Sequence, residues 1–148
     1  PGGGTQATLN DFEQGTFTPA WTYVTPGTLS VGYSSRSGTY TKIGDMVYFR
    51  LALVINSFTK GTASGVPLIS GLPFASANTS RNNPPVCLYT YNAPKNTTAG
   101  YQSSPYINQA DTNIYMQDFG NNTTTVNYAD PNGSSNEYYI SGCYKASA

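Results

Sequence analysis

Apolar and polar residues alternate along much of the chain with a period of two. The clearest case is the segment 46–55, MVYFRLALVI. Such alternation is typical of a β-strand, in which successive side chains point to opposite faces of the sheet. One face of this strand is predicted to lie in the core and carries Val47, Phe49, Leu51, Leu53 and Ile55. The opposite face, with Met46, Tyr48, Arg50 and Ala52, is amphipathic, and we expect it to contact something.

Further strands are predicted on both sides of this one. Gly44-Asp45 separates the segment 38–43 from 46–55, and a two-residue connection of this kind is typical of a β-hairpin. No window shows the apolar spacing of an amphipathic helix, and Gly, Pro, Asn and Ser recur every few residues. The remaining predicted strands are 17–24, 66–74, 85–93, 112–119, 123–129 and 137–145. Eight or so short strands with regularly spaced turns predict an all-β, antiparallel β-sandwich that is jelly-roll-like.

The composition agrees with this class and limits the partners. The chain has 148 residues, seven basic and seven acidic side chains and only 9% charged residues, but also 13 Tyr. A net charge of zero argues against nucleic acid as a partner, and no apolar run is long enough to insert into a membrane. We expect residues 1–8 to be either a flexible lead-in or, as the favoured interpretation, a linker left by a cut within a longer chain, and residues 9–148 to form a single β-sandwich domain.

Candidate catalytic chemistry is sparse. The chain has no His, which excludes Ser-His-Asp and Cys-His arrangements, and no phosphate-binding or dinucleotide-binding motif is present. A glycosidase needs two carboxylates, but Asp111, Asp118, Asp130 and Glu137 are interpreted as turn and cap residues. The segment 130–137 lacks the ligand spacing of a calcium loop. We therefore predict a protein that is not an enzyme and has no cofactor and no metal site.

The two cysteines lie in predicted strands. Cys87 and Cys143 can pair only if the fold brings them together, which the sequence leaves open. The favoured interpretation is that both are small buried side chains.

The segment 89–119 is the richest in tyrosine and short polar side chains. Sugars present apolar ring faces and hydroxyl groups, so aromatic platforms flanked by polar side chains suit them. The alternative is that these tyrosines only pack strands together or fill the seam between subunits. The candidate carbohydrate-binding residues are Tyr89, Tyr91, Tyr101, Gln102, Tyr106, Asn108 and Tyr115.

Several motifs run in order over nearly the whole chain. Together they resemble a domain found at the ends of bacteriophage tail-fibre and tailspike proteins, whereas the middle, 78–110, follows no family pattern. The motifs are Leu9-Asn10-Asp11 with Glu13, Gly15 and Thr16, then Tyr40-Thr41-Lys42-Ile43-Gly44, Gly71-Leu72-Pro73-Phe74 and Ser141-Gly142. The resemblance implies a compact β-structure that assembles as a homotrimer.

The resemblance also implies a place in the virion. Such domains lie at the distal end of a fibre and bind a host-surface polysaccharide, which predicts a non-catalytic receptor-binding module at a tail-fibre tip. Related domains decorate capsids, so the alternative is a structural module on the capsid surface, or a fibre-trimerising terminus, whose partners are other virion proteins.

Four charged residues, Arg36, Lys42, Asp45 and Arg50, gather around the predicted hairpin. They form either a solvated face that contributes little or part of a threefold interface, in which paired ions fix the register. The predicted trimer-interface residues are Tyr48, Arg50, Arg36 and Trp21, the last as either core or interface.

Overall fold

The computed structural model describes residues 11–80, 83–94, 101–119 and 125–147. Within these ranges the chain forms β-strands and no helix, so none has the length and apolar character needed to cross a bilayer. The predicted lead-in over 1–8 lies outside the described residues. The strands are β1 (Phe12–Phe17), β2 (Ala20–Thr25), β3 (Ser30–Ile43), β4 (Met46–Thr59), β5 (Ser64–Ser70), β6 (Cys87–Tyr91), β7 (Gln102–Ser103), β8 (Tyr106–Ile107), β9 (Asn113–Tyr115), β10 (Gln117–Phe119), β11 (Thr125–Asn127) and β12 (Asn136–Lys145).

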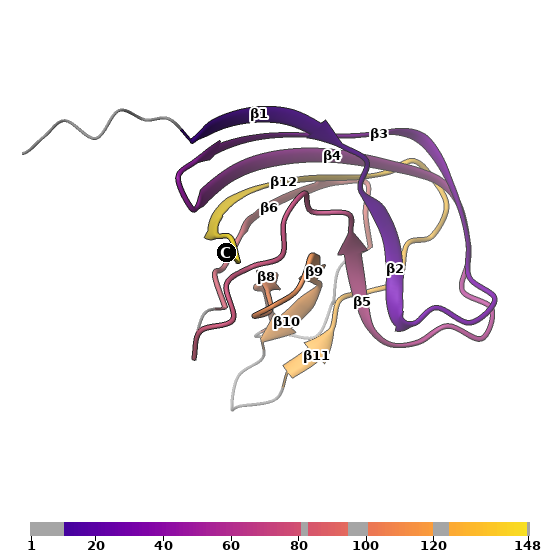
Figure 1. Cartoon of the computed structure of the whole chain (residues 1–148). Coiled ribbons are helices and arrows are strands. Elements are labelled where there is room, and N and C mark those ends of the chain that lie inside the picture. The colour runs from indigo at the N-terminus through magenta and orange to yellow at the C-terminus, as the bar shows by residue number, and fades with distance from the viewer. Residues whose placement is uncertain (1–10, 81–82, 95–100, 120–124, 148) are drawn as a thin grey trace, which may run out of the picture.

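The strands form two layers. A five-stranded sheet, ordered β1-β3-β4-β12-β6, arches over a four-stranded sheet, β2-β5-β9-β8, and a three-stranded sheet, β11-β10-β7 (Figure 1). Every strand pair is antiparallel. The chain passes repeatedly from one layer to the other, as in jelly-roll-like sandwiches. The predicted antiparallel β-sandwich is confirmed, whereas the homotrimer stays a prediction.

The β3–β4 hairpin is the longest feature of the fold. Gly44 begins its two-residue turn with a φ of +59°, a left-handed conformation that favours glycine. Each strand has 14 residues, so the hairpin extends well beyond the predicted segments 38–43 and 46–55.

Two predicted strands are each divided in the structure. The segment 17–24 breaks at Thr18-Pro19, because proline cannot donate a ladder hydrogen bond. The segment 112–119 breaks at Met116, whose N–H donates to Pro67 O on β5 and whose carbonyl accepts from Tyr128 N. Met116 therefore marks the point where the chain leaves one sheet for another. The two-residue strands β7 and β8 carry no periodic signal and were not predicted.

The core fills the space between the layers. As predicted, Val47, Phe49, Leu51, Leu53 and Ile55 of β4 are all buried. Trp21 of β2 packs on Tyr138 of β12 with ring centroids 5.1 Å apart. The Trp21 side chain is 2% exposed within one chain. Placing it at a subunit interface is therefore wrong, and its aromatic surface stabilises the sandwich instead.

The structure contradicts the interpretation that both cysteines are buried. Cys87 and Cys143 are both exposed and both are free thiols. They lie on the solvent face of β6 and β12, because their directly opposite neighbours are Ser141 and Tyr48, which are exposed. Alternation alone did not reveal which face of these two strands is buried.

Candidate functional site

The face of the five-stranded sheet that points away from the other layer is here called the outer face. Seven large apolar side chains of the described residues are exposed, and five of them lie on this face. These five are Phe12, Tyr48, Tyr89, Tyr91 and Tyr139. Water-exposed aromatic groups gathered on one sheet face indicate an interaction surface.

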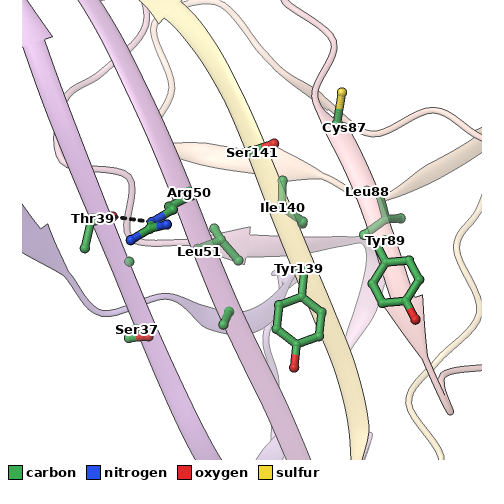
Figure 2. A pocket seen from close by; sticks show the side chains of 12 residues that line it. Ser37, Thr39, Arg50, Leu51, Cys87, Leu88, Tyr89, Tyr139, Ile140 and Ser141 are labelled. Carbon is green, nitrogen blue, oxygen red and sulfur yellow. Dashed lines mark hydrogen bonds between the residues drawn. The ribbon is translucent and has the colours of Figure 1, made fainter.

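A groove crosses the outer face over β3, β4, β12 and β6 (Figure 2). Strand register aligns Ser37, Ala52, Tyr139 and Tyr89 in one row across it. The adjacent row contains Thr39, Arg50, Ser141 and Cys87. The small side chains form the floor, and the volume of the groove is about 560 Å³.

Two tyrosines form an aromatic wall of the groove. Tyr89 and Tyr139 lie directly opposite each other on β6 and β12, with ring centroids 6.0 Å apart and ring planes at 36°. Tyr139 Oη donates a hydrogen bond to Glu137 Oε2 at 2.7 Å, and this bond raises the pKa of the Tyr139 hydroxyl. The wall therefore offers apolar ring faces with hydroxyl and carboxylate groups at its end.

Arg50 stands on the other side of the groove. Its Nε donates to Thr39 Oγ1 at 3.3 Å, a weak bond to a neutral group. No carboxylate pairs with Arg50 among the described residues. Its guanidinium is therefore a cation whose terminal amino groups are open to a ligand.

Arg50 also borders a second hollow. This hollow lies over β1, β3 and β4, with a volume of about 670 Å³ and Gln14, Thr16, Thr41 and Tyr48 in its lining. The sheet register places Phe12, Ile43, Met46 and Tyr48 on the outer face at the hairpin end, a group here called the hairpin-end patch. The outer face thus has two regions, with Arg50 between the groove and the second hollow.

The other hairpin charges have partners within the chain. Lys42 Nζ pairs with Asp11 Oδ2 at 2.8 Å, and Lys145 Nζ pairs with Asp45 Oδ2 at 2.9 Å. The lysine beside Asp45 lowers the pKa of that carboxyl. Lys42 and Asp45 therefore have partners within one chain, and their pairing across a threefold interface stays a prediction.

The Arg36 side chain lies on the face of the sheet opposite to that of Arg50. It lies opposite the inward-facing Leu53, and its guanidinium carbon lies 4.6 Å from the centre of the Tyr33 ring. This is a cation–π contact within the chain. Arg36 and Arg50 therefore do not share one surface, although the sequence grouped them.

The predicted carbohydrate-binding residues are divided among three places. Tyr89 and Tyr91 lie on the outer face, 62% and 61% exposed. Tyr106 and Tyr115, on the four-stranded sheet, stack on each other with ring centroids 5.3 Å apart. Tyr115 Oη also donates to Asp111 Oδ2 at 2.8 Å, so this half-buried pair is held by contacts within its own layer.

The remaining three predicted residues are Tyr101, Gln102 and Asn108, and none of them lines the groove. Gln102 is on β7 of the three-stranded sheet, next to the half-buried Tyr101. The Asn108 carbonyl accepts a hydrogen bond of 2.5 Å from Ser76 Oγ, and its side-chain oxygen accepts from Gln109 N. These residues do not line the groove with Tyr89.

Asp118 and Asp130 do not line the groove. Asp130 accepts hydrogen bonds from Tyr23 Oη at 2.5 Å and Lys60 Nζ at 2.8 Å. Asp118 is 1% exposed, and burial raises its pKa against a smaller opposing effect of the Ser103 hydroxyl. Among the described residues, no Asp or Glu lines either hollow. No group of three or more potential metal ligands occurs in the part of the chain that the structure describes.

The sequence did not single out Tyr139. Its signal was present, because Glu137, Tyr139, Ser141 and Cys143 alternate with buried residues of β12 in the same way as the outward residues of β4. What the sequence lacks is the pairing of β12 with β4 and β6. Only that pairing brings Tyr139 beside both Tyr89 and Arg50.

Comparison with known proteins relates the fold to part of a phage tailspike structure. The chain matches no protein-family model and no curated protein. It superposes on the crystal structure of the Dettilon tailspike protein (gp208) with a TM-score of 0.65 and 15% sequence identity. The match covers 90% of this chain but 24% of the tailspike chain. At this identity the likeness shows a shared fold: this β-sandwich is similar to one part of a phage tailspike protein.

Proposed function

We propose that this chain is a phage tail-fibre or tailspike domain that binds a host-surface polysaccharide as a homotrimer, without cleaving it. The observation that carries the proposal is the groove on the outer face, walled by the exposed Tyr89–Tyr139 pair. The likeness of the fold to part of a tailspike protein supports a place in the phage tail.

The chemistry of the groove suits a sugar. Aromatic rings stack on the apolar face of a sugar ring, and tyrosine does so at a low cost in conformational entropy. Ser37, Thr39 and Ser141 add hydroxyl groups that donate to and accept from sugar hydroxyls. The absence of Asp and Glu from the lining gives the groove no pair of carboxylates for glycoside hydrolysis.

The hairpin-end patch is the proposed site of self-association. Phe12 and Tyr48 are 57% and 49% exposed there, and Ile43 and Met46 are half-buried. A symmetric contact between copies would cover these groups and leave the groove open. Three grooves in one assembly then multiply a weak affinity for a repeating polysaccharide.

A structural role in the virion is the second candidate. The outer face as a whole is poor in charge and carries two free thiols, Cys87 and Cys143, as well as the five exposed aromatic groups. Such a surface also fits a contact with another virion protein. In that case the groove would be covered in the particle and would bind no sugar.

Binding to host cells separates the two candidates. A fluorescent fusion of the chain is incubated with bacteria that the parent phage infects and with their purified polysaccharide, and released reducing sugar is measured in the same samples. The proposal expects saturable binding without sugar release, and at least about a tenfold loss of affinity in the double variant Tyr89→Ala/Tyr139→Ala.

A matched control locates the site. Tyr101→Ala removes a tyrosine outside the groove and should bind like the parent. Release of reducing sugar would contradict the non-catalytic role. Absence of binding on a susceptible host would favour the structural role, and equal binding by the double variant would overturn the assignment of the groove.

A further inference from the structure

We propose that the groove is selective for an acidic sugar, one whose carboxylate pairs with Arg50. This inference rests on the proposed polysaccharide-binding function and adds the chemical class of the ligand and its orientation in the groove.

Every other cation of the described residues already has a partner within the chain. Lys42, Lys60 and Lys145 each form an ion pair of 2.8 or 2.9 Å with an aspartate, and Arg36 lies over the Tyr33 ring. Arg50 is the one cation of the described residues with neither a carboxylate nor an aromatic ring as its partner. It is also the one that lines the groove.

The geometry of the Arg50 guanidinium suits a carboxylate. Arginine presents a planar fork of N–H donors that matches the two oxygens of a carboxylate. The contact of Arg50 with Thr39 uses only Nε, so the amino groups at the tip are free to form such a pair. The Thr39 hydroxyl holds the stem of the side chain beside the groove.

The position of Tyr139 on the opposite wall of the groove indicates how a sugar ring would be oriented. Arg50 faces Ser141 across β4 and β12, and Tyr139 faces Ala52, which makes Arg50 and Tyr139 diagonal neighbours. Such neighbours lie about 7–8 Å apart in an antiparallel pair. A single sugar ring can therefore stack on Tyr139 while its carboxylate reaches Arg50.

Glu137 determines which end of the sugar lies beside Arg50. Its carboxylate accepts from Tyr139 Oη and lies beyond Tyr139 on the same face of β12. A negative group would repel an acidic substituent at that end and accept hydrogen bonds from sugar hydroxyls. The acid of the ligand therefore lies at the Arg50 end, and its hydroxyls lie at the Glu137 end.

The test compares one polysaccharide in two forms. Acidic polysaccharide from a bacterium that the protein binds is purified, and half of it is treated so that each carboxylate becomes a neutral primary alcohol. Affinity for both forms is measured with the parent and with Arg50→Gln, Arg50→Lys and Arg36→Gln. The Arg36 variant is the matched control, because it removes an exposed arginine on the other side of the sheet.

The proposal predicts a coupled loss. Carboxyl reduction should weaken binding to the parent at least about tenfold, and Arg50→Gln should weaken binding to the native form by a similar factor. Arg50→Gln should bind both forms alike, because the partner of the carboxylate is then already missing. Arg50→Lys should bind the native form with intermediate affinity, and Arg36→Gln should match the parent.

Other results overturn the inference. If the parent binds both forms equally, or binds only bacteria whose surface polysaccharide lacks acidic sugars, the selectivity is wrong while polysaccharide binding stands. If Arg50→Gln loses the same factor on both forms, Arg50 does not contact the acid. If the parent binds no polysaccharide from a susceptible host, the proposed function itself fails.

Discussion

Tyr89 and Tyr139 are opposite neighbours on adjacent antiparallel strands, and their rings lie 6.0 Å apart although the residues are far apart in the sequence. Both side chains are exposed, at 62% and 41% of their surface. An exposed aromatic pair beside an unpaired arginine is the central relationship of the proposed site. The remaining predictions follow from this surface and from the layer beneath it.

The ring of Tyr139 should matter more than its hydroxyl. Tyr139→Phe keeps the stacking surface and loses one hydrogen bond to Glu137, so we expect polysaccharide affinity within about threefold of the parent. Tyr139→Ala removes the ring and should weaken binding about tenfold or more. Titration of the two variants on one polysaccharide measures the difference. Equal losses in the two variants would show that the hydroxyl, rather than the ring, makes the contact.

Tyr48 should control assembly. It is half-exposed within the hairpin-end patch, so Tyr48→Ala should shift the proposed trimer toward the monomer while circular dichroism stays unchanged. Size-exclusion chromatography with light scattering measures the mass. Tyr91→Ala is the control, because it removes another exposed tyrosine at the other end of the same face. A trimer that persists in Tyr48→Ala would place the interface elsewhere.

The two cysteines report on the two regions of the outer face. Cys143 lies opposite Tyr48, whereas Cys87 lines the groove. In the assembled protein we expect Cys87 to react with an aromatic disulfide reagent and Cys143 to be protected. Tyr48→Ala should make Cys143 reactive. The single variants Cys87→Ser and Cys143→Ser assign the rates, and a Cys143 that reacts freely in the trimer would contradict the proposed contact.

Alternation along β4 predicts a large loss of stability at a buried position and a small loss at the adjacent outward position. Leu53 is fully buried, so Leu53→Ala should lower the free energy of unfolding by about 2–5 kcal/mol. Val54 lies on the outer face, and Val54→Ala should cost less than about 1 kcal/mol. Urea denaturation of the two variants measures both values. Similar losses at the two positions would contradict the register of β4.

Asp118 should make the protein less stable as the pH rises. Its pKa is raised in the folded chain by burial, so between the unfolded pKa, about 3.9, and the folded pKa the unfolded chain binds fewer protons. Stability contributed by the neutral acid is present below that window and is lost as the pH rises through it. Asp118→Asn should therefore raise the free energy of unfolding at pH 7 by about 1–3 kcal/mol, and the gain should shrink below pH 4.

A second carboxylate gives the contrast for this measurement. Asp111 accepts hydrogen bonds from Thr112 N, Asn113 N and Tyr115 Oη, and the single amide oxygen of an asparagine cannot accept all of them. Asp111→Asn should destabilise the protein at pH 7, opposite in sign to Asp118→Asn. Denaturant unfolding at the two pH values checks both, and a destabilised Asp118→Asn would show that the charged carboxylate has a favourable partner.

The sequence predicted those parts of the fold that depend on neighbours along the chain. The alternation of 46–55 correctly separated Leu51 and Leu53 from Tyr48 and Arg50, because the period of a strand is a local property. The turn at Gly44 was found for the same reason. Strand order is not local, so the pairing of β12 between β4 and β6 had no signal in the chain.

That missing information explains why the predicted site residues do not come together in the fold. Tyr89, Tyr101 and Tyr106 were grouped because they are close in sequence, but the structure places them on three different sheets or their margins. Tyr139, distant in sequence, is the neighbour that Tyr89 has in space. Cys87 was expected to be buried because nothing in the short β6 segment shows which face meets the core.

The most direct test of the outer-face site is the reaction rate of the Cys87 thiol with and without host polysaccharide. Cys87 lines the groove beside Ser141, and Cys143→Ser leaves it as the single thiol of the chain. A bound glycan should slow the reaction of Cys87 saturably, and half of the effect should be reached at a glycan concentration equal to the dissociation constant. An unchanged rate at a polysaccharide concentration that saturates binding would show that the glycan binds elsewhere and would contradict the proposed site.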